Sequence, residues 1–513
     1  MGVAVHLSGV SKRFGNFAAN SNISLSIEEG TIHALVGENG AGKSTLTKII
    51  YGMLQPSEGE VCIQGKPVHF TSPREAIDAG IGMVHQHFML IPTLSVTENI
   101  MLGNEHASLF QRLPLKSIEA LVQKLAQEFG LAVDPKALVE NLSVGEEQRV
   151  EILKLLFRNA SIMIFDEPTA VLTPSEIEHL FATLRTLRDN GKSIILITHK
   201  LDEVLTVADT ISVMRRGEIA GTMPAKSITK PELARMMVGR SVLLRVKNQP
   251  PTPGKTVLNI NKLGFCTPNG ETKLQNLTLN VKAGEIYGIA GVEGNGQSEL
   301  LQSLYGLAPA ETSLSGETML KGESILGKKP AEITLMGVSL TPENRLRHAV
   351  ILDYSVSENL LFGRHRERSF HRGIGFNSDV VNRYTRQMID DYDIKCNSPV
   401  SQPLSSLSGG NQQKIVLARE FNRPNISLLI LAQPTRGVDI GAIETIHNKI
   451  IEARTKGIAI LLISSELEEI IALSTRIGCI YKGAIVHEFT EEEVALKRHS
   501  ELEFKKEIGF HIT

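Results

Sequence analysis

The sequence is poor in cysteine, and none of its four cysteines stands near another. They are Cys62, Cys266, Cys396 and Cys479. No two of them have the C-x-x-C spacing of a zinc or redox motif. This arrangement indicates a reducing compartment and argues against a disulfide framework or a zinc module.

Long hydrophobic runs and an excess of one charge are also missing. No apolar stretch approaches the roughly 18–20 residues that a membrane helix requires, and the first residues, with Lys12 and Arg13, do not resemble a secretory signal. The 54 Lys+Arg and 56 Asp+Glu residues nearly balance, so bulk charge gives no support for a nucleic-acid partner and leaves only a local basic patch open. A length of 513 residues, with 42% hydrophobic and 21% charged residues, predicts a soluble globular chain of several domains.

What the sequence does contain is a glycine-rich segment that fits the pattern G-x-x-x-x-G-K-[ST]. Its residues are Gly37, Glu38, Asn39, Gly40, Ala41, Gly42, Lys43, Ser44 and Thr45. An apolar run precedes it and helically spaced apolar residues follow it, which is the strand–loop–helix context of a phosphate-binding loop. In such a loop backbone N–H groups face phosphate oxygens, Lys43 reaches the β- and γ-phosphates, and the Ser44 hydroxyl holds Mg²⁺. The alternative, a glycine-rich turn without a ligand, is disfavoured by the lysine and serine at the required positions.

A long internal repeat organises the rest of the chain. The glycine loop reappears in altered form at Gly291–Ser298, and a Leu-Ser-x-Gly segment occurs at Leu142–Gly145 and again at Leu407–Gly410. The segment Ser161–Thr169 likewise corresponds to Ser427–Thr435. Two copies of one unit, each of about 240 residues, therefore fill the sequence.

The repeat predicts two domains joined by a linker. We expect the first domain at residues 1–243, the second at 256–513, and between them a proline-rich, extended linker at 244–255. The regions near 88–141 and 345–406 are rich in helix formers and interrupt the core of each copy. We expect each of them to be a helical insertion.

Three apolar runs of the first copy predict strands that are buried on both faces of a parallel sheet. They are Thr31–Val36, Ser161–Phe165 and Ser193–Ile197. Polar groups follow each run at once: the glycine loop, the pair Asp166 and Glu167, and Thr198 with His199. Since ligands bind beyond the carboxyl ends of strands in open α/β sheets, we expect these groups to meet at one edge.

The glycine loop, the Leu-Ser-x-Gly segments, the apolar run that ends in Asp-Glu and the downstream histidine together resemble the ATP-binding cassette family. The resemblance covers nearly all of both copies. It implies an α/β fold of two tandem P-loop, RecA-like cassettes with mostly parallel sheets, each with a helical insertion and a small antiparallel β subdomain. In that family two cassettes face each other, and each nucleotide lies between the glycine loop of one and the LSGGQ segment of the other. The implied ligands are ATP and Mg²⁺, and the implied reaction is ATP hydrolysis.

The resemblance assigns hydrolytic roles to the polar residues at the strand ends. Glu167 matches the glutamate that orients and polarises the attacking water, and His199 matches the switch histidine that contacts the γ-phosphate. Mg²⁺ prefers octahedral oxygen ligands, and the residues expected to supply them are Ser44, Gln86 and Asp166. A strand-end cap for the two carboxylates and a structural role for the histidine are the alternatives.

Other residues are expected to bind the nucleotide itself. Phe14 lies where an aromatic ring usually stacks on adenine, with a plain strand or core aromatic as the alternative. The nucleotide of the first copy is expected to meet four residues of the second copy: Ser408, Gly409, Gly410 and Asp439.

The second copy has lost groups that this chemistry requires. Its lysine position is Gln297, and its aspartate and glutamate positions are Ala432 and Gln433. Its histidine position is Ser465, and Glu343 stands at the position of Gln86, which resembles the Q-loop glutamine of the family. Alanine has no oxygen for Mg²⁺, and a neutral amide cannot accept a proton as a base.

The Leu-Ser-x-Gly segments differ in the opposite sense. The second copy keeps Leu407–Gln412, whereas the first has Val144 in place of a glycine and Glu146 further on. The intact groups thus belong to the site made of the first loop and the second segment, and the losses belong to the other site. This segregation predicts one hydrolytic site per chain. The alternative, that the second copy is only a spacer, is disfavoured by its intact Ser408–Gly410 and Gly437–Asp439.

Three classes of ATPase compete for the biological role. A transporter motor needs separate permease chains. Soluble cassette proteins that act on ribosomes or DNA usually carry a charged connector, zinc modules or two intact sites, and a metabolic P-loop kinase or GTPase lacks the duplication. Transport is favoured.

Among transporters, the chain resembles duplicated ATPase subunits of bacterial importers for simple sugars and nucleosides. Leu142–Ile152 and Pro434–Gly437 resemble the whole group, while Ala432–Gln433, Val84–Leu90 and Gly291–Gln297 look like the nucleoside branch. A sugar importer is the alternative. The resemblance implies two membrane-spanning permease subunits and an extracytoplasmic solute-binding protein as partners, no nucleic acid, and a peripheral position on the cytoplasmic face of the membrane. The helical insertions are expected to dock the permeases.

Overall fold

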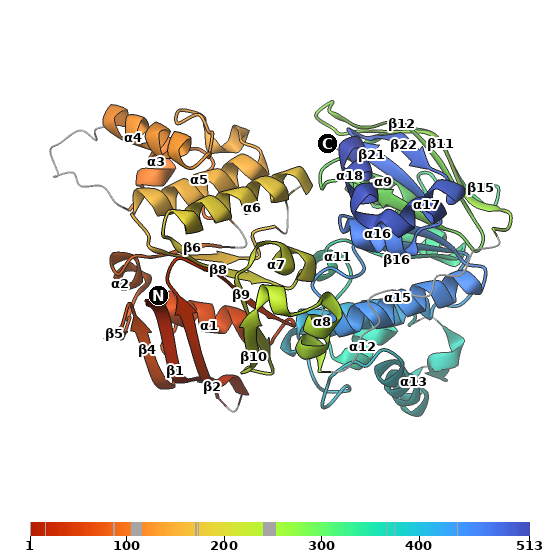
Figure 1. Ribbon diagram of the computed structural model, residues 1–513. Helices are drawn as coiled ribbons and strands as arrows, with labels where there is room; N and C mark the ends of the chain where they lie inside the picture. The colour runs from red at the N-terminus through yellow and green to blue at the C-terminus, as the bar shows by residue number, and fades with distance from the viewer. Residues whose placement is uncertain are drawn as a thin grey trace. The chain divides into compact units, whose positions relative to one another are not determined.

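The computed structural model divides the chain into two compact units, Met1–Val242 and Leu243–Thr513. It describes residues 2–15, 17–85, 88–103, 115–169, 172, 174–239, 253–365, 367–373, 375–438 and 440–512. Most of the predicted linker therefore lies outside the described residues. Each unit is considered by itself (Figure 1).

The first unit is built on a six-stranded sheet of order β10-β9-β3-β8-β7-β6. Its strands are β3 (Ile32–Gly37), β6 (Ile81–Val84), β7 (Ile162–Asp166), β8 (Ser193–Thr198), β9 (Thr210–Arg215) and β10 (Glu218–Pro224). All neighbouring strands run parallel except β9 and β10. The three apolar runs thus form strands of a mostly parallel sheet, as the sequence predicts.

Alternate residues of β7 show how both faces of this sheet are buried. Ile162 and Ile164 pack into one apolar cluster, while Met163 and Phe165 pack into a second. Since successive side chains of a strand point to opposite faces, an uninterrupted apolar run suits a strand that is covered on both sides.

A small antiparallel sheet and helices provide these covers. The small sheet has the order β2-β1-β4-β5, with β1 (Val3–Phe14), β2 (Phe17–Glu28), β4 (Glu58–Ile63) and β5 (Lys66–Val68). The helices are α1 (Lys43–Ile50), α2 (Pro73–Asp78), α3 (Val96–Met101), α4 (Leu115–Glu128), α5 (Val144–Phe157), α6 (Pro174–Asp189), α7 (Leu201–Val207) and α8 (Lys230–Val238). Figure 1 shows α1 and the small sheet on one side of the large sheet and α3–α6 on the other. The predicted β subdomain and helical insertion are both present.

The second unit repeats this plan with a sheet of order β16-β19-β20-β13-β21-β22. Its strands are β13 (Ile286–Ala290), β16 (Val338–Thr341), β19 (Leu428–Ala432), β20 (Ala459–Ser464), β21 (Arg476–Tyr481) and β22 (Ala484–Phe489). Its small sheet, β12-β11-β14-β15, contains β11 (Thr256–Cys266), β12 (Thr272–Lys282), β14 (Ser313–Leu320) and β15 (Glu323–Ser324).

The insertion of the second unit is not purely helical. Besides helices it contains a two-stranded hairpin of β17 (His371–Arg372) and β18 (Gly375–Phe376), which the prediction of a helical insertion omits. The helices of this unit are α9 (Gln297–Tyr305), α10 (Pro330–Leu335), α11 (Arg345–His348), α12 (Val356–Leu361), α13 (Ser378–Asp391), α14 (Gly409–Phe421), α15 (Ile440–Thr455), α16 (Leu467–Leu473), α17 (Glu491–Lys497) and α18 (Glu501–Ile512). The ring centres of His371 and Phe376 lie 5.0 Å apart across the hairpin.

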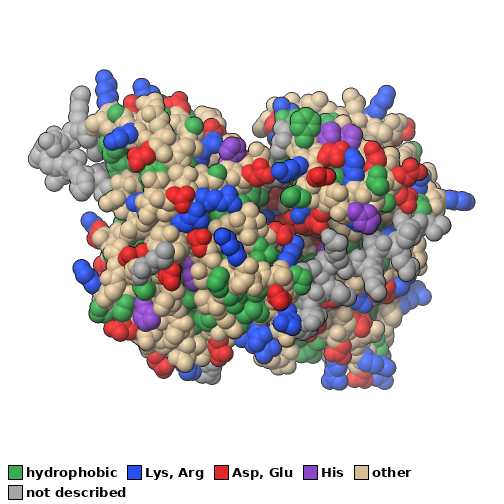
Figure 2. Space-filling model, viewed as in Figure 1, with side chains coloured by type: hydrophobic (Ala, Val, Ile, Leu, Met, Phe, Trp, Pro, Cys, Tyr) green, Lys and Arg blue, Asp and Glu red, His purple; other side chains and the backbone are tan. Residues whose placement is uncertain are grey.

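The surface reflects the balanced composition. Side chains of both charges are intermixed over the visible face of each unit (Figure 2). Within the described ranges, no helix combines the length and the hydropathy that crossing a membrane requires.

Candidate functional site

Strand register brings the predicted catalytic residues of the first unit to one edge of the sheet. Val36 of β3 lies opposite Thr198 of β8, and Asp166 of β7 lies opposite Ile197 of β8. The glycine loop and the Asp-Glu and Thr-His pairs therefore leave the sheet at the same level. The predicted convergence at the carboxyl ends of the strands is present.

The backbone of the loop requires glycine at specific positions. Gly40 and Gly42 have φ angles of 81° and 99°, in the region that side chains with a Cβ rarely adopt. A Cβ on Gly42 would lie 2.4 Å from the carbonyl oxygen of Ala19, and one on Gly37 would lie 2.3 Å from that of Met214. Helix α1 begins directly after Gly42, so the loop and the first turn form a cradle with the shape of a phosphate site.

Lys43 is buried inside this cradle, with 6% of its surface exposed. Its Nζ donates hydrogen bonds to the carbonyl oxygens of Gly37, at 2.7 Å, and Glu38, at 3.0 Å. Burial lowers the pKa of Lys43, against the opposing charges of Glu167 and Asp166. A buried ammonium that is held by carbonyl oxygens suits a ligand rich in negative charge.

Glu167 and His199 form a hydrogen-bonded pair. His199 Nδ1 lies 2.9 Å from Glu167 Oε1, and because an ionised carboxylate only accepts hydrogen bonds, the ring donates through Nδ1. Burial acts to raise the pKa of Glu167, but the hydrogen bond and charge of His199 and the nearby lysines outweigh it, so the pKa is lowered. The φ angle of Glu167 is 48°, a strained conformation of the kind found at functional sites. The pair can act as an oriented base.

Asp166 lies beside this pair at the end of β7. Burial, and then the charge of Glu167, raise the pKa of Asp166 to about 6, against a lowering by Lys43. Two adjacent carboxyl groups with one raised and one lowered pKa are a feature of sites that use them differently. The oxygens of Asp166 suit a cation that replaces the proton.

Of three further residues predicted to contact nucleotide or metal, the structure describes only Phe14. Gln86 and Asp439 lie outside the described residues, so their roles stay predictions. Phe14 ends β1 and is 48% exposed, with Lys12 Nζ 5.5 Å from its ring centre. It is therefore an exposed strand residue and not a core aromatic. Phe17, its partner across the hairpin, is 63% exposed.

The second unit keeps the shape of the loop without its charge. Gly294 and Gly296 have φ angles of 93° and 104°, and α9 begins at Gln297. Gln297 Nε2 donates to the carbonyl oxygen of Val292 at 2.9 Å, the counterpart of the bond from Lys43 to Glu38. Its Oε1 is buried with no hydrogen-bond partner among the described residues.

In the second unit, neutral groups occupy the positions that correspond to Glu167 and His199. Gln433 has a φ angle of 50°, and its Oε1 accepts hydrogen bonds from the backbone N and the Oγ of Ser465, both at 3.2 Å. The hydroxyl of Ser298, which corresponds to Ser44, donates to Glu343 Oε2 at 2.8 Å. The backbone conformation at this edge matches that of the first unit, but an amide replaces the carboxylate of Glu167.

The two Leu-Ser-x-Gly segments differ in how their helices begin. Ser143 caps α5 in a reciprocal capping box with Glu146: the serine Oγ donates to Glu146 Oε2 at 2.8 Å, and Glu146 N donates to the serine Oγ at 3.3 Å. Ser408 makes no such cap on α14 and instead accepts from Asn411 Nδ2 at 3.0 Å. The first segment thus presents a carboxylate, whereas the second leaves the N–H groups of its first turn open to an anion.

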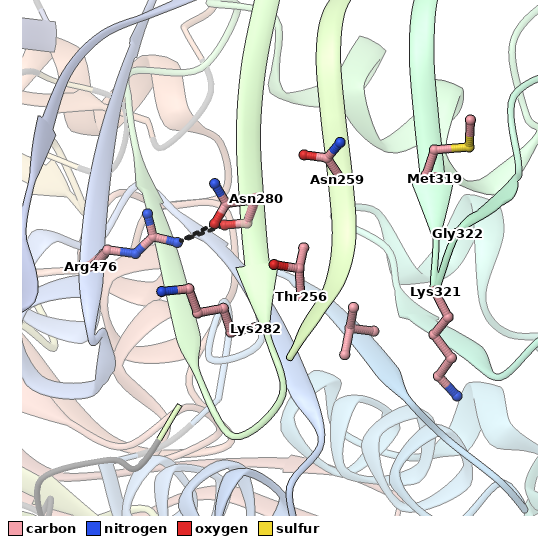
Figure 3. Close-up of a pocket in the computed structure, with 9 residues that line it drawn as sticks. Thr256, Asn259, Asn280, Lys282, Met319, Lys321, Gly322 and Arg476 are labelled. Atoms are coloured by element: carbon pink, nitrogen blue, oxygen red, sulfur yellow. Dashed lines mark hydrogen bonds between the residues drawn. The ribbon is translucent and has the colours of Figure 1, made fainter. Parts of the chain in front are cut away.

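An open hollow of about 640 Å³ lies on the small sheet of the second unit and contains no predicted site residue. Figure 3 shows Lys282, Lys321 and Arg476 around it. Arg476 is bonded to Asn280 and forms ion pairs with Glu285 and Glu488. The guanidinium of Arg476 therefore links β21 to β12 and β22.

Each unit thus carries a glycine loop, followed by a helix, at the edge of a mostly parallel sheet, and this arrangement defines a P-loop nucleotide-binding protein. The sequence pattern of the ABC transporter family matches residues 20–170 and 274–436, once in each unit. The chain belongs to the ABC transporter family and is an ATPase with two tandem ATP-binding cassettes. This confirms the predicted α/β fold and family.

Full-length relatives match almost the whole chain. The nucleoside import ATP-binding protein NupA of Lactococcus lactis subsp. cremoris is 46% identical over 482 residues, 94% of each chain. The guanosine import ATP-binding protein NupO of Bacillus subtilis is 44% identical over 501 residues, 97% of each chain. The glucose import ATP-binding protein TsgD13 of Haloferax volcanii is 41% identical over 522 residues, 96% of this chain and 94% of the relative.

Proposed function

We propose that this chain hydrolyses ATP to drive a membrane importer and that the imported solutes are nucleosides. The supporting observation is the similarity to NupA and NupO, which are named for nucleoside and guanosine import and match at 46% and 44% identity. A sugar importer is the second candidate, since a glucose import protein matches at 41%. The neutral Ala432–Gln433 pair, which resembles the nucleoside branch, favours the first.

We further propose that the chain consists of a first cassette at residues 1–243, a linker at 244–255 and a second cassette at 256–513. It has one hydrolytic site, made of the glycine loop of the first cassette and the signature segment Ser408–Gly410 of the second. Lys43 and the Glu167–His199 pair support the first half of this site. The uncapped start of α14 supports the second half, and Asp439 is added on the sequence pattern. The other possible site combines the second glycine loop, which has no lysine, and the first Leu-Ser-x-Gly segment, in which Ser143 is hydrogen-bonded to Glu146.

Mg²⁺ is the proposed metal, and Ser44, Gln86 and Asp166 are its proposed ligands. A serine hydroxyl and a buried carboxyl group with a raised pKa form a donor set that fits a hard cation. When bound, the metal neutralises charge on the phosphates. Glu167 orients the attacking water and accepts its proton, while His199 holds the carboxylate in place and faces the γ-phosphate.

The affinity for Mg²⁺ should depend on pH through Asp166. Because the pKa of its carboxyl group is about 6, the proton competes with the metal below that pH, and the apparent affinity should fall about tenfold for each further pH unit. Titration of Mg²⁺ in the presence of a non-hydrolysable ATP analogue measures this. Asp166→Asn should bind Mg²⁺ more weakly and give a flat profile. An unchanged wild-type affinity between pH 6 and pH 5 would contradict the assignment.

The proposed partners are two permease subunits, docked on the helical insertions, and an extracytoplasmic solute-binding protein. They place the chain on the cytoplasmic face of the membrane. Closure of the two cassettes on ATP would move the docking surfaces and so drive alternating access. No nucleic-acid partner is proposed.

Co-purification of the assembled transporter tests the solute assignment. The binding protein that accompanies this chain should bind nucleosides, and reconstituted vesicles should take up nucleosides only when ATP is supplied. Glu167→Gln in the same vesicles is the control for coupling. Nanomolar sugar affinity without nucleoside affinity would replace the nucleoside assignment with the sugar one.

A further inference from the structure

A guanidinium with no acidic partner among the described residues lies beside the signature segment of the second unit. Arg345 begins α11, yet its Nη2 lies 2.3 Å from the position that a Cβ on Gly409 would occupy. Its Nη1 lies 3.5 Å from the corresponding position on Gly437 and donates to the carbonyl oxygen of Arg436 at 3.4 Å. The guanidinium thus lies between the two segments whose sequence predicts contact with nucleotide.

The described surroundings of Arg345 offer its charge no carboxylate. Burial and the charge of Arg436 lower the pKa of Arg345, and among the described residues no carboxylate pairs with it. Arg436 has its own partner, Glu293, at 2.6 Å. The Nε of Arg345 is buried and makes no hydrogen bond within the described part of the chain. A half-buried cation with unused donors is costly unless an anion binds to it.

At the position that corresponds to Arg345, the first unit has no cation. When the two copies are aligned so that Gln86 corresponds to Glu343, the position of Arg345 corresponds to Phe88. Phe88 packs against the apolar cluster of the helical insertion. The start of α5, which corresponds to the start of α14, carries the carboxylate of Glu146. The guanidinium therefore accompanies the signature segment that is open to an anion, and only that one.

We propose that Arg345 is a catalytic residue whose guanidinium donates hydrogen bonds to the γ-phosphate of the ATP held by Lys43. This inference rests on the proposed site made from both cassettes. A guanidinium offers several donors in a rigid plane, which suits the equatorial oxygens of a phosphoryl group in transfer. As the water oxygen bonds to the γ-phosphorus, the bond to the β–γ bridging oxygen breaks and Glu167 takes the water proton. ADP and inorganic phosphate leave, and Arg345 stabilises the charge that develops between them.

Arg345→Met tests this role in the full-length chain. We expect kcat for ATP to fall about 10²-fold or more, because a charged donor to the transferring group is lost. ADP contains no γ-phosphate, so its affinity and the unfolding temperature should stay unchanged. Aluminium fluoride should no longer trap ADP, and Arg345→Lys should recover part of the turnover. The matched control is Arg347→Met, because Arg347 is exposed on the same short helix; its turnover should equal that of the wild type.

Each remaining outcome has a defined meaning. If the turnover of Arg345→Met stays within about threefold of the wild type, the proposal is overturned, because the loss of an arginine that contacts the transferring phosphate lowers turnover far more than this. If the ADP affinity and the unfolding temperature of Arg345→Met fall together with its turnover, the proposal is also overturned, because these losses show a structural role. Glu167→Gln is measured alongside: if that variant keeps its turnover, the proposed hydrolytic site fails, which is distinct from a failure at Arg345 alone.

Discussion

Replacing Glu167 with glutamine is expected to reduce ATP turnover to background, a loss of about 10³-fold or more. General bases contribute about 10²- to 10⁴-fold, and the intact pair of Glu167 and His199 is the only such pair among the described residues of the two catalytic edges. A glutamine side chain can still accept the hydrogen bond from His199, so the geometry is kept while the base is lost. Nucleotide binding should persist, because Lys43 and the glycine loop are unchanged.

The matched control lies at the equivalent position of the second unit. Gln433 has nearly the same backbone conformation as Glu167, with φ angles of 50° and 48°, so Gln433→Glu and Gln433→Ala change the corresponding side chain in the other cassette. Both should keep turnover within about twofold, since the lysine position there is Gln297 and the position of the metal-binding aspartate is Ala432. Phosphate release by purified protein measures all of these variants. Substantial turnover in Glu167→Gln, or a large loss in Gln433→Ala, would contradict the assignment of hydrolysis to the first set of groups.

Copying the capping box of the first unit into the second is expected to lower turnover by about 10- to 100-fold. Asn411 occupies the position in α14 that Glu146 occupies in α5. Asn411→Glu would engage the Ser408 hydroxyl and place a carboxylate where the proposed site receives the γ-phosphate. A capping box stabilises a helix by about 0.5–2 kcal/mol, so the protein should not become less stable.

Two further variants separate charge from lost contacts. Asn411→Ala removes the amide that bonds Ser408 and the backbone N of Lys395 without adding a charge, and should cost less than about threefold in turnover. Glu146→Asn opens the box of the first unit and should lower stability by about 1 kcal/mol with turnover unchanged. Thermal unfolding and phosphate release measure both effects. A fully active Asn411→Glu protein would show that the start of α14 does not meet the phosphate.

The sequence predicted the fold because its signals are local and repeated. The run Thr31–Val36 is apolar throughout, and the observed β3 differs from it by one residue at each end. The meeting of Asp166, Glu167 and His199 also followed from the sequence, since parallel strands bring their carboxyl ends to one edge. The capping box at Ser143 and Glu146 has the S-x-x-E pattern and could have been predicted as well.

Other features depend on contacts between distant segments. Arg345 precedes Gly409 by a whole insertion, and no periodicity links an arginine on α11 to the start of α14. The bond between Ser298 and Glu343 likewise joins the first turn of α9 to the segment that follows β16, much later in the chain. The hairpin in the second insertion was missed because its strands, of two residues each, are too short to show alternation.

Counting trapped nucleotide tests the single-site account most directly. The full-length chain is incubated with ATP, Mg²⁺ and aluminium fluoride, free nucleotide is removed, and the retained ADP is counted and located by photolabelling. We expect one ADP for each chain, with the label from its adenine ring in Met1–Val242, where Phe14 and the first glycine loop lie. Two ADP molecules for each chain, or a label at the second glycine loop, Gly291–Ser298, would contradict a single hydrolytic site.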